Sequence, residues 1–243
     1  MRFFRLTITS AEADYQPVKL ALFRNYRLPL SEAENMAMEP PFAPPQSQPL
    51  WKAARCSSAA PTYFDNVDGK YVDGGLIANN PTLDLLTELQ LHNTAANYME
   101  KPNECIDLGC VLSIGTGRTP RKQMSMAATS LDLGTFPQNP LQAIAKVWGV
   151  KDFGNLLIDQ VTATDGRPVD RSRAWCEALG VPYFRFSPQF TEDVALNETD
   201  DEKLVRMLWQ TEEYMRREHA RVQSFVELMN CLCPHRDTVS YHK

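Results

Sequence analysis

The segment KYVDGGLIANNP, at residues 70–81, gathers residue types that proton-transfer chemistry needs. The carboxylate of Asp73 follows Tyr71-Val72, which predicts a short strand, and it precedes Gly74 and Gly75. Two glycines permit a turn with positive φ and let a second backbone or a substrate come close. A carboxylate in apolar surroundings is a better proton acceptor near neutral pH, so the segment is a candidate general base. An ordinary Asp-Gly turn is the alternative that spacing alone leaves open.

A serine nucleophile that works with such a carboxylate would be expected between glycines, in the motif G-x-S-x-G. The chain has 11 glycines, beginning at Gly69, and no two of them lie four residues apart. The nucleophile elbow G-x-S-x-G is therefore not found in these 243 residues. The serines nearest the motifs are expected to pack or to form hydrogen bonds: Ser57, Ser58 and Ser113. The histidines are expected at the surface or in the C-terminal tail: His92, His219, His235 and His242.

A second glycine-containing stretch, Gly115-Thr116-Gly117-Arg118, follows an apolar run. Two interpretations of it remain open. One is a nest of backbone N–H groups that binds a lipid phosphate beside the charge of Arg118. The other is a tight turn at the exit of a strand. Nucleotide-binding fingerprints fail, because the required third glycine or phosphate-binding lysine is not in place. No cofactor and no metal are expected.

The composition is that of a folded protein without a strong affinity for polyanions. Hydrophobic residues make up 43% and charged residues 23% of the chain, which excludes a disordered or fibrous protein. The net charge of -5 argues against a nucleic-acid partner. The 6 cysteines form no C-x-x-C pair, and the N-terminus shows no secretory signal, so a reducing cytoplasm is expected. No stretch approaches the roughly 20 apolar residues of a membrane span, so any membrane contact is expected to be peripheral.

Patterning predicts several elements in the first half of the chain. The β-type runs 3–9 and 18–26 predict a hairpin. Five prolines within residues 39–49 predict an exposed, partly polyproline loop. Residues 50–60 predict a helix, and Asn80 as N-cap predicts a second helix that runs to about position 92.

The second half of the chain combines strands and helices. Residues 108–114 lack alternation and predict a strand covered on both faces. Two helices are expected within residues 140–161, and a third over residues 170–179 precedes a strand at 182–186. Residues 200–232 carry apolar side chains at helical spacing and predict one long element. The fold class expected is mixed α/β with a helical C-terminal part.

The segment around Asp73 resembles the Asp-Gly-Gly/Ala box of the patatin-like phospholipases, and the resemblance spans about residues 15–232. Residues 50–64 resemble the run W-x-A-A-R-x-S-x-A-A-P-x-Y-F that precedes this box, and residues 113–118 resemble the strand end S-[LI]-G-T-G. Four further segments resemble the animal calcium-independent phospholipase A2 branch of this family in particular: residues 22–26, 165–167, 170–171 and 173–177.

The resemblance implies a catalytic role for Asp73. In this family a serine within G-x-S-x-G attacks the acyl ester of a glycerophospholipid, and the aspartate of the box is its base. By position Asp73 is that aspartate, with Gly74 and Gly75 shaping its turn. The family's nucleophile elbow and glycine-rich oxyanion loop lie N-terminal to the matched region. The expectation is therefore a patatin-like mixed sheet flanked by helices, with the N-terminal part of the domain missing and a helical C-terminal extension.

The resemblance also implies a domain division, a function and partners. Residues 1–86 are expected to hold the C-terminal part of the patatin-like domain, and residues 87–243 to continue the same catalytic unit. The expected function is calcium-independent hydrolysis of phospholipids at a membrane surface by a cytoplasmic, peripherally bound protein. A catalytically inactive form that acts as an interaction or regulatory module is the alternative. Residues 173–186 correspond to a region implicated in calmodulin binding in this branch, although a core helix followed by a strand fits them as well. A homo-oligomer is left open.

Overall fold

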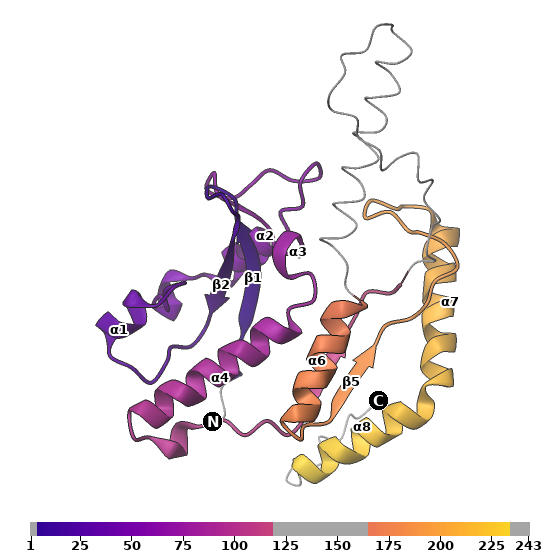
Figure 1. The fold of residues 1–243 in the computed structure, drawn as a ribbon. Coiled ribbons are helices and arrows are strands. Elements are labelled where there is room, and N and C mark those ends of the chain that lie inside the picture. Colours follow the sequence, from indigo (N-terminus) through magenta and orange to yellow (C-terminus); the bar gives the residue numbers. More distant parts are fainter. Residues whose placement is uncertain (1–3, 119–164, 234–243) are drawn as a thin grey trace, which may run out of the picture. The chain divides into compact units, whose positions relative to one another are not determined.

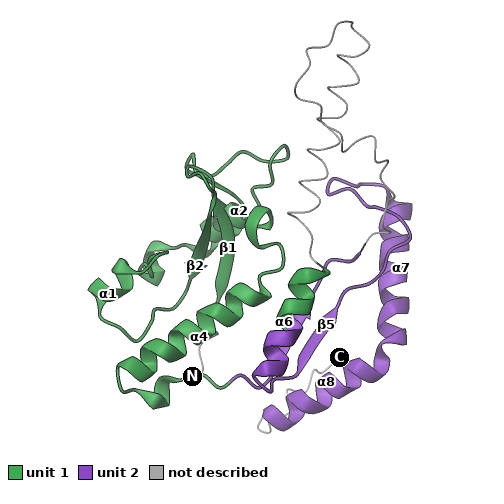
Figure 2. Ribbon diagram, viewed as in Figure 1, with its two compact units in different colours: residues 1–107, 123–172 green, residues 108–122, 173–243 purple. Residues whose placement is uncertain are grey.

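The computed structural model describes residues 4–118 and 165–233 and divides the chain into two compact units (Figure 2). Unit 1 comprises residues 1–107 and 123–172, and unit 2 comprises residues 108–122 and 173–243. The helices expected within residues 140–161, and also His235 and His242, lie outside the described residues. The elements, most of which are labelled in Figure 1, have these bounds: β1 (Thr7–Glu12), β2 (Lys19–Arg24), α1 (Glu32–Ala37), η1 (Pro45–Ser47), α2 (Leu50–Ser57), β3 (Tyr71–Asp73), α3 (Gly75–Ala78), α4 (Thr82–Tyr98), η2 (Pro102–Glu104), β4 (Val111–Ile114), α6 (Arg167–Ala178), β5 (Tyr183–Phe186), α7 (Asp201–Arg217) and α8 (His219–Leu232).

Unit 1 is built on a three-stranded antiparallel sheet in the order β2-β1-β3. β1 and β2 pair along their whole length, so the predicted hairpin is confirmed, although its first strand begins at Thr7 instead of Phe3. β3 pairs with the other edge of β1, and this register sets Asp73 opposite Ser10. The central strand therefore fixes the backbone of the candidate base.

The helices of unit 1 begin and end where local chemistry favours it. α1 has a capping box, in which the Ser31 side chain accepts the N–H of Glu34 and the Glu34 carboxylate accepts the N–H of Ser31. The predicted helix in residues 50–60 is confirmed as α2. The second predicted helix is α4, but its N-cap is Pro81 instead of Asn80, and it continues to Tyr98, beyond the predicted end near position 92. The Asn80 side chain accepts a hydrogen bond from the Thr82 hydroxyl at 2.7 Å.

The proline-rich loop 39–49 is not exposed throughout. Phe42 is only 1% exposed and belongs to the core of unit 1 with Leu28 and Ala95. The prolines prevent regular structure, but they leave a large apolar side chain free to gain burial. The loop is thereby anchored at its centre.

Unit 2 contains a two-stranded parallel sheet of β4 and β5, and α8 packs on it through an edge-to-face contact of Phe225 with Phe184. The strand expected at 108–114 is confirmed in part, as β4. Its expected coverage on both faces is wrong, because Leu112 and Ile114 are 40% and 73% exposed. Successive side chains of a strand point to opposite faces, so in the described residues one face of β4 is covered and the other is not.

The C-terminal element is two helices, not one. The predicted helical structure is confirmed, but α7 ends at Arg217 and α8 begins at His219, with Glu218 between them. The Tyr214 hydroxyl accepts the Ser187 N–H at 3.2 Å, and Arg221 donates to the Arg185 carbonyl at 3.2 Å. These bonds hold both helices to the segment around β5, so the chain bends between them.

The mixed α/β class is confirmed, with two small sheets in the described residues in place of the single sheet expected. α6 begins at Arg167, before the predicted cap Asp170, and it ends near Gly180, whose φ of 68° stops the helix as predicted. The division at residues 86 and 87 falls inside α4 and stays a prediction.

Candidate active site

Asp73 ends β3 at the point where the chain leaves the sheet. Its N–H donates to the Ala59 carbonyl at 3.0 Å, and the Gly74 N–H donates to the Ser57 carbonyl at 3.2 Å. The Gly75 N–H donates to Oδ1 of Asp73 at 2.6 Å. The residues Asp73–Gly75, called the Asp73 turn below, are thus held by the end of α2 and by the turn's own amide. This arrangement fixes one carboxylate oxygen of Asp73.

Both glycines of the Asp73 turn are required by space. A Cβ at Gly74 would collide with the backbone carbonyl of Thr9 on β1. A Cβ at Gly75 would lie 2.9 Å from Oδ1 of Asp73 and 3.0 Å from Oδ1 of Asn79. Neither glycine has a positive φ, so that predicted reason for the two glycines is wrong. The other predicted reason, close approach of a second backbone, is confirmed at Gly74.

A buried hydroxyl next to the Asp73 turn was not predicted from the sequence. Ser10 is fully buried, and its Oγ donates to the Val72 carbonyl at 2.8 Å, with the Cys56 carbonyl at 3.3 Å. One side chain thereby joins β1, β3 and α2 around Asp73. The predicted strand ends at residue 9 and leaves Ser10 in a polar turn, so no signal in the sequence indicates this role.

A buried ion pair supports the same sheet. The Arg24 side chain on β2 donates from Nη2 to Oε1 of Glu88 on α4 at 2.8 Å, and both side chains are almost fully buried. The Tyr26 hydroxyl donates to Oε2 of Glu88 at 3.0 Å, and the guanidinium lies 3.9 Å from the ring centroid of Phe42. Arg24 carried part of the family resemblance, but its partner 64 positions away could not be identified from the sequence.

The serines near the motifs have structural partners, as expected. The Ser58 hydroxyl donates to the Ala54 carbonyl at 2.9 Å, and the Ser57 carbonyl accepts the N–H of Gly74. Ser113 in unit 2 is buried and accepts from Arg185 at 3.0 Å.

The histidine expectation needs one correction. His92 lies on α4 and is only 2% exposed, so it is a core residue and not a surface residue. Burial lowers its pKa from the ordinary value of 6.5. His219 is exposed, as expected.

The stretch Gly115–Arg118, called the Gly115 turn below, lies in unit 2. The N–H groups of Gly115 and Arg118 donate to the carbonyls of Phe186 and Pro188 at 2.8 and 2.7 Å. Gly117 has a φ of 117°, and a Cβ there would collide with the ring of Phe190. Two of the N–H groups that a phosphate nest would need are therefore committed to the neighbouring chain. This geometry favours the strand-exit turn.

Residues 173–186, for which the family resemblance implies calmodulin binding, consist of the second half of α6 followed by β5. Gly180 and Pro182 separate the two, so no continuous amphipathic helix runs through residues 173–186. The helix-and-strand alternative describes this region.

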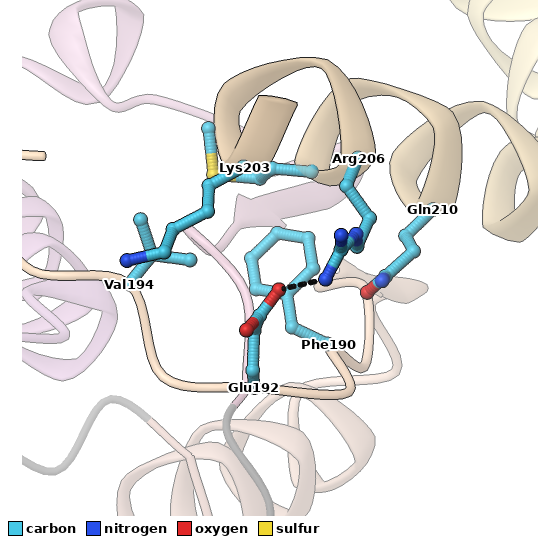
Figure 3. A pocket seen from close by; sticks show the side chains of 7 residues that line it. Phe190, Glu192, Val194, Lys203, Arg206 and Gln210 are labelled. Atoms are coloured by element: carbon cyan, nitrogen blue, oxygen red, sulfur yellow. Dashed lines mark hydrogen bonds and ion pairs between the residues drawn. The ribbon is translucent and has the colours of Figure 1, made fainter. Parts of the chain in front are cut away.

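A small pocket in unit 2 contains none of the predicted site residues (Figure 3). The loop after β5 and the start of α7 line it, and an ion pair between Glu192 and Arg206 at 2.8 Å spans it. Nζ of Lys203 forms an ion pair with Oε2 of Glu198 at 2.7 Å. The described part of the chain holds no cluster of side chains suited to a metal ion, and none of its helices is long and apolar enough to cross a membrane.

Comparison with known proteins adds a family to this geometry. The family described as "Patatin-like phospholipase" matches residues 31–86, which include the Asp73 turn. The "85/88 kDa calcium-independent phospholipase A2" of Rattus norvegicus is 40% identical over 230 residues, covering 93% of this chain and 28% of the relative. The "Intracellular phospholipase A2" of Caenorhabditis elegans is 33% identical over 225 residues, covering 93% and 19%. The chain thus spans less than a third of the length of these relatives.

Proposed function

Because the chain belongs to the patatin-like phospholipase family and is similar to its calcium-independent phospholipase A2 branch, we propose that it supplies the general base of a serine–aspartate dyad. The reaction is the hydrolysis of acyl esters of glycerophospholipids. The observation that carries the proposal is the Asp73 turn, in which the Gly75 amide holds Oδ1 at 2.6 Å at the end of β3. Positioning of this kind is what a base needs in order to act without a histidine.

In the proposed reaction, Asp73 accepts the hydroxyl proton of the serine while the serine oxygen bonds to the ester carbonyl carbon. The tetrahedral intermediate then collapses, the ester C–O bond breaks, and Asp73 returns the proton to the departing lysophospholipid oxygen. Water repeats the two steps on the acyl-enzyme and releases the fatty acid. The serine belongs to a G-x-S-x-G segment that precedes the matched region in the family and is not found in these 243 residues.

Exposed aromatic side chains support a lipid surface as the place of reaction. α2 and the loop after it, which hydrogen-bond to the Asp73 turn, present Trp51 at 71% and Phe64 at 59% exposure. The guanidinium of Arg55 lies 5.3 Å from the ring centroid of Phe64. Aromatic rings beside a cation suit the boundary between lipid headgroups and acyl chains. We therefore extend the proposal to peripheral membrane binding, and the name of the worm relative fits an intracellular location.

A chimera tests the proposal: the 243 residues replace the matched segment of the rat relative, so that a nucleophile elbow is present. We expect fatty acid release from phospholipid vesicles without calcium, and a loss of about 10²- to 10⁴-fold on Asp73→Asn. Asp65→Asn, at an exposed position, is the matched control and should leave the rate unchanged. An Asp73→Asn chimera that keeps full activity and a normal melting temperature would overturn the role of Asp73.

The isolated chain distinguishes this proposal from a complete enzyme. We expect no fatty acid release from the 243 residues alone, and turnover that Asp73→Asn abolishes would contradict the missing-serine argument. The alternative of an interaction module is favoured by one observation, the exposed stripe of Val205, Leu208 and Trp209 on α7. Those side chains would suit an apolar protein partner. An inactive chimera together with specific capture of the isolated chain by its full-length relative would support that alternative.

A further inference from the structure

The end of α8 lies directly against the residues that lead into β4, both within unit 2. A Cβ at Gly109 would lie 2.8 Å from Cδ1 of Leu232, which shows how closely that side chain approaches the backbone before β4. The thiol of Cys110 donates to Sδ of Met229 at 3.7 Å. Met229 and Cys233 are four residues apart, and the N–H of Cys233 donates to the Met229 carbonyl at 2.9 Å. Cys233, the C-cap of α8, therefore follows Met229 by about one helical turn, which places it on the side of the helix end that contacts Cys110.

We propose that Cys110 and Cys233 form a reversible disulfide when the protein meets an oxidant of the peroxide class. Both thiols are free in the structure. The bond would join the chain just before β4 to the end of α8, two segments that the Gly109 and Met229 contacts already hold together. A disulfide requires such proximity of the two backbones.

The exposure of the two thiols assigns them different roles. Cys233 is exposed, whereas Cys110 is half-buried, and burial, with a smaller contribution from Cys233, raises the pKa of the Cys110 thiol. The Cys233 thiolate therefore attacks hydrogen peroxide first, which gives a sulfenic acid and hydroxide. The Cys110 sulfur then attacks the sulfenic sulfur, the S–O bond breaks, and water leaves with the thiol proton. The two thiols lose two electrons in total, which reduce one peroxide to two waters.

Three other cysteines provide controls. Cys231 is exposed like Cys233, but two residues along a helix correspond to a rotation of about 200°, so it faces away from the Met229 face. Cys56 and Cys176 are fully buried. Cys231 is thus the matched control for an exposed thiol on the same helix end that does not lie beside Cys110.

The first experiment maps disulfides in the oxidised chain. The 243-residue protein is treated with hydrogen peroxide, free thiols are alkylated, and tryptic peptides are quantified by mass spectrometry. We expect the Cys110–Cys233 peptide to be the main cross-link and to disappear on reduction with dithiothreitol. It should be lost in Cys233→Ser and retained in Cys231→Ser. A main cross-link that involves Cys231, or a Cys110 that stays reduced while Cys233 oxidises, would overturn the proposal.

A second experiment needs no oxidant. Dibromobimane, which becomes fluorescent when it bridges two neighbouring thiols, is added to the reduced chain in buffer and in guanidinium chloride after the reductant has been removed. We expect bridging of Cys110 and Cys233 in buffer to exceed bridging in denaturant at least severalfold. Equal yields of all cysteine pairs in both solutions would contradict the proposed proximity. Neither measurement depends on phospholipase activity, so the proposal stands or fails independently of the role of Asp73.

Discussion

The Asp73 turn and the Gly115 turn look alike in sequence but differ in what surrounds their glycines. Each follows a short strand, β3 or β4, and each carries two glycines at places where a Cβ does not fit. In the Asp73 turn, an amide of the turn holds a carboxylate oxygen. In the Gly115 turn, the amides donate to the last residue of β5 and to the segment after it, and the glycines make room for the side chains of Arg185 and Phe190. Glycines at a strand end therefore indicate close packing, and only the residue held by the turn indicates chemistry.

The largest expected effect concerns the support of the Asp73 turn. Glu88→Gln would leave the buried guanidinium of Arg24 without its charged partner, so we expect a loss of about 3–5 kcal/mol in the free energy of unfolding. Urea denaturation measures it. Glu212→Gln removes an exposed i,i+4 partner of Arg216 and is the control, with no measurable change expected. Equal losses in the two variants would show that the buried pair does not anchor this sheet.

Substitution of alanine at each turn should cost more stability where the new Cβ meets backbone atoms than where it meets the ends of side chains. Gly74→Ala meets the backbone carbonyl of Thr9, whereas Gly115→Ala meets the ends of the Arg185 and Ser187 side chains. Overpacking costs about 1–3 kcal/mol, and we expect Gly74→Ala near the upper and Gly115→Ala near the lower end of this range. Chemical unfolding of both variants decides it, and the reverse order would contradict the comparison.

Gly75→Ala should affect catalysis more than stability. Alanine is favourable at the start of α3, but its Cβ would lie 2.9 Å from Oδ1 of Asp73 and displace the carboxylate. In the chimera we expect hydrolysis to fall about 10- to 100-fold with little change in melting temperature. Gly115→Ala, assayed in parallel, should keep most of the activity. A Gly75→Ala chimera as active as its parent would mean that the turn does not position the base.

A smaller effect should appear in the pH dependence of stability. Burial lowers the pKa of His92 below 6.5 in the folded chain, so between the two values the unfolded chain binds more protons. The stability that neutral His92 contributes is therefore present above about pH 6.5 and is lost as the pH falls toward the pKa of the folded chain. We expect His92→Gln to flatten the fall of the melting temperature between pH 7 and 5. The exposed His219→Gln serves as the control and should leave that slope unchanged.

The smallest effect is expected at Arg118. Its N–H and side chain contact the carbonyls of Pro188 and Ser187, and the geometry favours a packing turn. Arg118→Ala in the chimera should change the rate on anionic vesicles less than about twofold, since an exposed charge contributes little. A large rise in the KM for anionic lipid, with kcat unchanged, would instead establish a phosphate site there.

Local signals predicted the elements well, whereas long-range partners could not be predicted. The hairpin, α2, β3 and the stop at Gly180 follow from alternation, small residues and glycine, which act within a few positions of the chain. The buried ion pair of Arg24 with Glu88 depends on two residues 64 positions apart, and no local pattern encodes that distance. The bend at Glu218 similarly depends on bonds to the segment around β5, while the helical periodicity continues through it. The candidate base was found because its neighbours are local, and its supports were missed because they are not.

The hydroxyl of Ser10 limits how the candidate base could be transplanted. It reaches backbone carbonyls of residues 72 and 56, which lie 62 and 46 positions away along the chain. A designer who grafted only the loop DGG onto a new scaffold would leave behind the strand and the helix end that this hydroxyl ties together. The smallest portable unit is therefore three separate pieces of chain, joined in space by a side chain that takes no part in the proposed proton transfer.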